Sequence, residues 1–215
     1  MSMRGLEFLR HQPRLIAFGF FATFFSSFGQ TFFISLSGAE IRAAYDLSHG
    51  DFGMIYMVAT LASAGLLIWA GRKIDDMDLR LYSALTIGGL GLACAGMAAV
   101  EHVLLLGLVI FALRFTGQGL MSHISIVSVA RYVERGRGKA LSVASLGFPV
   151  GEALFPTLVV LVFSMISWRQ MWGGLAIAIP LLVLPFMLWL LKGQKARHAD
   201  HQQRQQSLAA EGGET

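Results

Sequence analysis

Two charged residues, Arg114 and Glu152, lie inside long apolar stretches of this sequence. An ionisable side chain in a membrane-spanning helix costs about 2.5 to 3.5 kcal/mol to insert, so it needs a buried partner or a water-filled cavity. Each charge lies about 11 residues from the same side of the membrane, which is roughly 16 Å of helix. Equal depth on consecutive antiparallel helices allows an ion pair between Arg114 and Glu152.

Other polar residues share the helix faces of these charges at 100° per residue, and the first apolar stretch has a similar polar face. They are Gln118, Ser122, Ser125 and Ser128 with Arg114, then Ser142, Ser145 and Pro149 with Glu152, and Thr23, Ser26, Ser27, Gln30 and Ser37 in the first stretch. We therefore expect the first, fourth and fifth helices to face a hydrated interior.

Each of these residues also has a purely structural interpretation. Arg114 and Glu152 could form a structural ion pair, and Ser or Thr could bond to its own helix backbone. We favour a functional role for the two charges, because intramembrane charges usually mark a substrate or ion path. For single Ser and Thr residues we favour the backbone interpretation. His123 lies opposite Arg114 on its helix, which favours a packed histidine over a proton relay.

The composition identifies the elements that must position these residues. Of 215 residues, 55% are hydrophobic and 14% are charged, against roughly 25% charged in soluble domains. Six apolar stretches are long enough to cross a bilayer, which takes about 20 residues. They cover residues 15–37, 52–71, 80–100, 103–129, 140–164 and 170–191. The sequence thus predicts an all-α membrane protein, with the first stretch as an uncleaved helix because it is too long for a secretory signal.

The bundle should extend over residues 15–191, between a cytoplasmic N-terminus (1–14) and a polar cytoplasmic tail or linker (192–215). Most Lys and Arg residues outside the spans lie in the two terminal segments and in the second and fourth loops. This distribution places both termini in the cytoplasm, in a membrane such as the bacterial inner membrane. The tail is rich in Gln, Ala and charge, which is typical of a disordered extension. Its basic residues serve as a topology anchor, so no nucleic-acid partner is expected.

Other chemistry finds no support in the sequence. A single cysteine, Cys94, excludes an intramolecular disulfide and a Cys-rich metal site. Gly138 and Lys139 match the Gly-Lys pair of a phosphate-loop motif. However, Val133 lies where that motif needs its first Gly, and Ala140 lies where it needs Ser or Thr. No nucleophile elbow or metal-ligand spacing occurs in the sequence. We expect no enzymatic activity, no cofactor and no metal.

Three motifs, in order along the chain, resemble those of the major facilitator superfamily. The first resembles its Gly-x-x-x-Asp loop signature, although Asp76, Asp78 and Leu79 depart from the family pattern. The second is similar to its fourth-helix motif, and the third to the Trp-Arg opening of its sixth helix. The matching residues are Gly71, Asp75 and Arg80, then Arg114, Gly117, Gln118 and Gly119, and then Ser167, Trp168, Arg169 and Trp172. Gly147, Gly151 and Pro156 only loosely resemble its fifth-helix signature, which supports no antiporter assignment.

The resemblance implies the N-terminal six-helix half of a transporter, built as a 3+3 inverted repeat. It implies that helices 1, 2, 4 and 5 line the cavity, that helices 3 and 6 are peripheral, and that Gly71, Asp75 and Arg80 form a conformational loop motif. The pair Gly29-Gln30 in the first helix and the pair Gly117-Gln118 in the fourth helix are a short sequence similarity between the two repeats.

We therefore expect secondary active transport of a small solute, such as an organic anion, by alternating access. Arg114 would hold an anionic group or exchange partners with Glu152, which is the candidate carrier of a coupling proton. Gln30 and Gln118 would supply neutral hydrogen bonds. The family usually has twelve helices, so a second six-helix half would come from another chain, self-association or residues missing here. The alternative is a truncated membrane protein without transport activity, or a membrane-embedded interaction partner.

Overall fold

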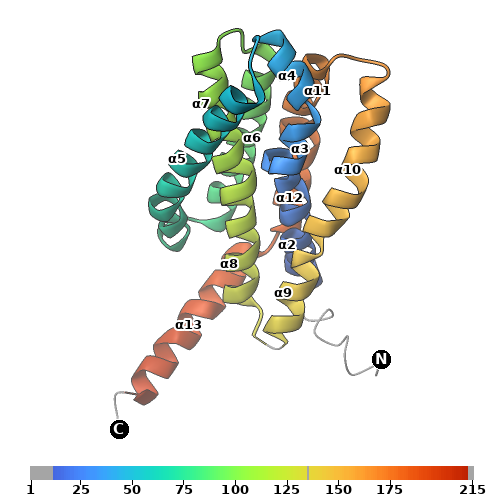
Figure 1. Ribbon diagram of the computed structural model, residues 1–215. Coiled ribbons are helices and arrows are strands. Elements are labelled where there is room, and N and C mark those ends of the chain that lie inside the picture. The colour runs from blue at the N-terminus through green and yellow to red at the C-terminus, as the bar shows by residue number, and fades with distance from the viewer. Residues whose placement is uncertain (1–11, 135, 213–215) are drawn as a thin grey trace.

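The computed structural model describes residues 12–134 and 136–212, and it folds them into a helical bundle (Figure 1). Six segments are long and apolar enough to cross a membrane, which confirms the six predicted helices. Numbered as spans 1 to 6, they are Pro13–Leu36, His49–Asp76, Leu79–Ala99, Val103–Tyr132, Arg137–Phe163 and Trp168–Leu190. Residues 1–11 of the predicted N-terminal segment, Arg135 of the fourth loop and residues 213–215 of the tail lie outside the described residues.

Four of the spans are interrupted, whereas spans 2 and 3 are the continuous helices α5 (His49–Asp76) and α6 (Leu79–Ala99). Span 1 consists of α2 (Pro13–Phe25), the 3₁₀ turn η2 (Ser26–Gly29) and α3 (Thr31–Leu36), and α4 (Gly38–Ala44) follows it. Span 4 consists of α7 (Val103–Leu113), the π-helical segment η3 (Arg114–Met121) and α8 (Ser122–Tyr132). Span 5 consists of α9 (Arg137–Ser145) and α10 (Gly147–Phe163), and span 6 of α11 (Trp168–Ala178), the π-helical η4 (Ile179–Val183) and α12 (Leu184–Leu190).

The start of α2 and the last helix, α13 (Gln194–Gly212), lie at one end of the bundle, which we name the terminal end (Figure 1). The loop between α10 and α11 lies at the opposite end. Ser48 and Ser167 form capping boxes with Asp51 and Gln170, which satisfy free backbone N–H groups where α5 and α11 begin. Polar caps therefore set the span boundaries that hydropathy alone leaves open.

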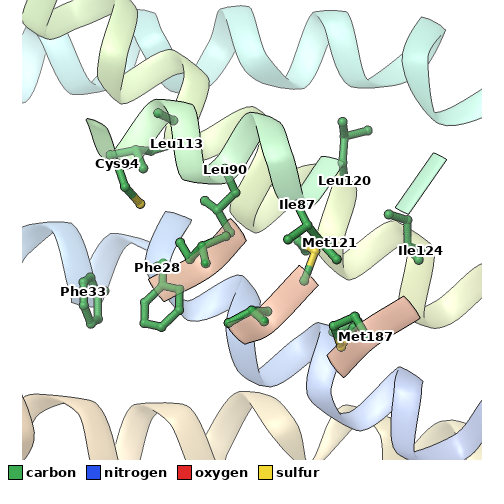
Figure 2. Packing of buried hydrophobic residues seen from close by; sticks show 14 of the residues in the cluster. Phe28, Phe33, Ile87, Leu90, Cys94, Leu113, Leu120, Met121, Ile124 and Met187 are labelled. Carbon is green, nitrogen blue, oxygen red and sulfur yellow. The ribbon is translucent and has the colours of Figure 1, made fainter. Parts of the chain in front are cut away.

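Span 1 packs between spans 4 and 5, because small residues let the backbones approach. A Cβ added to Gly147 would lie 2.6 Å from the backbone nitrogen of Phe24. The Thr23 hydroxyl donates a 2.5 Å hydrogen bond to the Ala144 carbonyl of span 5. The Ser125 hydroxyl of span 4 donates to the Gly19 carbonyl at 2.7 Å. Side chains of spans 1, 3, 4 and 6, such as Phe28, Leu90, Met121 and Met187, fill the core beside these contacts (Figure 2).

Arg169 joins three segments at the opposite end of the bundle. Its guanidinium donates to the carbonyls of Val100 at 2.6 Å and Ala98 at 3.3 Å, where span 3 ends. It also donates to the Tyr45 hydroxyl at 3.1 Å, and its Cζ lies 4.3 Å from the ring centre of Trp168. The Trp-Arg motif thus caps the C-terminal end of span 3 and fixes the start of span 6 against it.

The tail corrects one prediction, because it forms the helix α13 instead of a disordered extension. Ala, Gln, Arg and Lys are good helix formers, so the composition that suggests disorder also permits a helix. The Tyr132 hydroxyl and His198 Nδ1 lie 3.1 Å apart, and Arg204 forms an ion pair with Glu134. Burial at this contact lowers the pKa of the Arg197 guanidinium, with Tyr132 opposing the shift. The helix is therefore attached to the end of span 4.

Candidate functional site

The candidate site lies where span 1 and span 4 both lose α-helical geometry. Span 1 changes to a 3₁₀ turn that ends at Gly29, and Gln30 is extended, with φ −85° and ψ 156°. Span 4 is π-helical from Arg114 to Met121. A Cβ built on Gly29 would lie 2.7 Å from Gly117 Cα, so only a glycine pair allows this contact. Interrupted helices and π-helical turns occur frequently at functional sites in proteins.

Arg114 is buried at this contact, with 7% of its surface exposed. Its Nη1 donates to the Thr31 hydroxyl at 3.0 Å, to the Gly29 carbonyl at 3.4 Å and to the Gln118 amide oxygen. All three acceptors are uncharged. The extended backbone at Gln30 is what brings the Gly29 carbonyl and the Thr31 hydroxyl to the same guanidinium nitrogen.

Span 2 completes the surroundings of Arg114 through Tyr56. The Arg114 Cζ lies 5.3 Å from the Tyr56 ring centre, which is within the range of a cation–π contact. The Tyr56 hydroxyl donates to the Thr31 hydroxyl at 3.0 Å. Arg114 Nε is buried and has no hydrogen-bond partner in the described part of the chain. Within residues 12–134 and 136–212, the groups that compensate the guanidinium charge are therefore neutral dipoles and an aromatic face.

Glu152 is not the partner of Arg114 in this structure, although the two depths match. No ion pair joins these two described residues, and the Glu152 side chain is exposed. The reason is that span 1 lies between η3 of span 4 and α10 of span 5, although α8 and α9 of the same two spans are in contact. Gly151, next to Glu152, packs against the Ser27 hydroxyl of span 1, while η2 contacts η3 on its other side. Equal depth therefore does not place two side chains next to each other.

Several polar residues that we expected to face a hydrated interior are used in packing instead. Thr23, Ser26, Ser27, Ser125 and Ser128 are buried. The Ser26 and Ser128 hydroxyls donate to backbone carbonyls of their own helices, as the structural interpretation predicts. Ser37 is buried against span 6, where it accepts a hydrogen bond from the Trp172 indole nitrogen at 3.2 Å. Its position follows from the break at Gly29 and Gln30, which interrupts the 100° periodicity.

The other predicted polar residues remain accessible, at least in part. Gln118, Ser142 and Glu152 are exposed, and Ser122 and Ser145 are half-buried. Gln30 is half-buried and donates to the Ser26 hydroxyl at 3.0 Å. Thr31 and Tyr56 were missed by the sequence analysis. Thr31 directly follows the predicted Gln30, but nothing in the sequence links Tyr56 to the fourth helix.

The loop motif contacts α8, the part of span 4 that lies toward the terminal end of the bundle. Gly71 contributes its backbone, because its carbonyl oxygen lies 2.9 Å from His123 Nε2. Asp75 forms an ion pair with Arg131, which also donates to the Ile74 carbonyl at 3.3 Å. His123 is thus a packed histidine that holds the end of span 2. Arg80 lies in the first turn of α6, where its backbone N–H donates to the capping Asp78 carboxylate at 2.9 Å.

The described residues contain no group of three or more His, Cys, Asp or Glu side chains that could hold a metal ion. A comparison with protein-family models matches residues 19–212 to the Major Facilitator Superfamily. This match begins within span 1 and covers spans 2 to 6 in full. Searches of curated proteins and of solved structures gave no match.

Proposed function

This chain belongs to the Major Facilitator Superfamily, and we propose that its small solute binds at the contact between spans 1 and 4 and crosses by alternating access. Membership of this family implies an integral membrane protein that transports a small solute. The proposal adds the site, the mechanism and the class of solute. Arg114 would bind an anionic group of an organic solute, Gln30 would supply a neutral hydrogen bond to that solute, and Gln118 would hold the guanidinium in the empty site.

The observation that carries this proposal is the buried charge of Arg114, which lies between two interrupted helices and has no carboxylate partner among the described residues. A charged group inside the membrane normally has a counter-charge or a functional reason to lack one. Discontinuous helices near the bilayer midplane form the binding sites of many secondary transporters. Glu152 is exposed on span 5, and there it would carry a coupling proton.

A second six-helix bundle would complete the pathway. Only 11% of the apolar window of span 2 and 17% of that of span 5 are buried, against 56% in span 1. The exposed surface includes the polar side chains of Thr31, Gln118 and Glu152, which are costly to place against lipid. We propose that the second bundle covers this face and that the basic terminal end lies in the cytoplasm.

The test is uptake of radiolabelled organic anions, screened across pH, into membranes that contain the chain with its second bundle. Arg114→Ala should abolish uptake while the protein elutes normally in size-exclusion chromatography. Arg72→Ala, which removes an exposed positive charge at the end of span 2, should leave uptake unchanged. Normal uptake by Arg114→Ala would contradict the proposed site. A strictly monomeric chain in crosslinked native membranes would favour the alternative of a membrane protein without transport.

A further inference from the structure

We propose that the amide oxygen of Gln118 is an internal substitute for a carboxylate, and that a monocarboxylate solute displaces it from Arg114. This inference rests on the proposed function and assigns the class of solute and the group that it replaces. Gln118 then acts as a specificity-determining residue, because the oxygen that it places on the guanidinium carries no charge.

The contacts of Arg114 identify what is missing from the site. Its described polar contacts are a backbone carbonyl, a hydroxyl and an amide oxygen, and its aromatic contact is Tyr56. A carboxylate can pair with a guanidinium through two parallel charge-assisted hydrogen bonds, which adds energy and geometric specificity that a single neutral oxygen does not provide. A buried Arg with neutral acceptors and a free Nε therefore retains most of its capacity to bind an anion.

Of the three acceptors on Arg114, Gln118 is the one that a ligand can replace. The Gly29 carbonyl belongs to a backbone that is held against Gly117 by close packing. The Thr31 hydroxyl is held by the hydrogen bond from Tyr56. The Gln118 side chain is exposed, and Arg114 is its described hydrogen-bond partner. A solute that arrives from the exposed face reaches Gln118 and can rotate its side chain away without disturbing the backbone.

The charge of the site favours a single carboxylate over a dianion. The groups that contact Arg114 are all neutral, so one positive charge is available to the solute. A second carboxylate at this depth would remain unpaired in a low-dielectric environment, which is strongly unfavourable. A neutral amide would only replace one amide oxygen by another and would gain little. The site should therefore prefer monocarboxylates to phosphate, dicarboxylates and amides.

Two substitutions of Gln118 test this inference in the full chain, reconstituted in lipid nanodiscs and followed by tryptophan fluorescence and thermal unfolding. The probes are sodium benzoate, sodium succinate, inorganic phosphate and benzamide. Benzoate should bind the unmodified chain at least tenfold more tightly than the other three probes. Gln118→Glu places a permanent carboxylate on Arg114, so it should raise the unfolding temperature without ligand and weaken benzoate binding at least tenfold. Gln118→Ala should bind benzoate at least as tightly as the unmodified chain.

Gln203→Glu is the matched control, because it makes the same change at an exposed position of α13 and should alter neither measurement. Equal benzoate affinity of Gln118→Glu and the unmodified chain would overturn the inference. So would benzamide, succinate or phosphate binding as tightly as benzoate, or loss of binding in Gln118→Ala with its fold intact.

Uptake measurements distinguish the failure of this inference from the failure of the proposed transport function. If the complete transporter carries a neutral solute and Gln118→Glu leaves that uptake unchanged, the inference fails while transport stands. If benzoate binds as expected but no solute is carried, the transport proposal fails.

Discussion

Gly29 and Gly117 lie backbone to backbone, so that a Cβ on Gly117 would approach Gly29 Cα to 2.6 Å. Each glycine precedes a glutamine, and each lies within an interrupted part of its span. Residues related by a two-fold axis can touch only if they lie close to that axis. The contact is therefore what an inverted repeat of three helices would produce at its centre, with Arg114 beside it.

Alanine at either glycine should destabilise the bundle. We expect Gly29→Ala or Gly117→Ala to cost about 1 to 3 kcal/mol, because the added methyl group meets backbone atoms that cannot move aside. The measurement is the unfolding temperature in detergent. Gly88→Ala in α6 is the control, since a Cβ there meets nothing within 4 Å and should not lower the temperature. Two unaffected glycine variants would contradict the close packing.

His123 should stabilise the end of span 2 more than the Asp75 ion pair does. The ion pair with Arg131 involves a carboxylate whose side chain is 65% exposed, so Asp75→Asn should cost about 0 to 1 kcal/mol. His123→Ala removes the hydrogen bond between the imidazole and the Gly71 carbonyl together with the packing of the ring against Gly71, which should cost about 1 to 3 kcal/mol. Thermal unfolding of both variants checks this order, with Asp76→Asn, which removes an exposed ion pair to Lys73, as a surface control. A larger effect of Asp75→Asn than of His123→Ala would reverse our interpretation of this loop.

Arg169→Ala should loosen the opposite end of the bundle. The substitution removes charge-assisted hydrogen bonds to Val100 and Tyr45, each worth about 1.5 to 3 kcal/mol in general. We expect a lower unfolding temperature and faster proteolysis of the loops at this end. Arg42→Ala, at a half-buried residue with no side-chain hydrogen bond to the described residues, serves as the comparison. If both variants unfold at the same temperature, Arg169 does not hold these segments together.

The orientation can be measured because Cys94 is the only cysteine in the chain and is buried. In a Cys94→Ala background, Lys192→Cys should react with a membrane-impermeant maleimide only after cells are opened. Glu101→Cys, in the exposed turn between spans 3 and 4, should react in intact cells. The opposite pattern would place the basic terminal end outside the cytoplasm, against the distribution of Lys and Arg.

The sequence predicts the number of spans well, because each apolar stretch is long and the bilayer imposes one length on all of them. It predicts the positions of polar side chains less well. The 100° rule holds along a regular helix, so it fails for Ser37, which lies beyond the break at Gly29 and Gln30. The sequence also gives the depth of a residue in the membrane, but it does not show which side chains are neighbours. For this reason it allows an ion pair between Arg114 and Glu152 that does not form. Tyr56 reaches Arg114 through tertiary packing, which no local pattern encodes.

The π-helical turns of span 4 have a consequence for the spacing along this helix. A π-helical turn holds one more residue than an α-helical turn, because its hydrogen bonds join residues five apart instead of four. If span 4 were an unbroken α-helix of the same sequence, the extra residue would turn everything after it by about 100°. Ser125, His123 and Arg131 would then point away from Gly19, Gly71 and Asp75. The π-helical turns therefore absorb the extra residue and keep the half of the helix that carries the charge in phase with the half that is anchored to its neighbours.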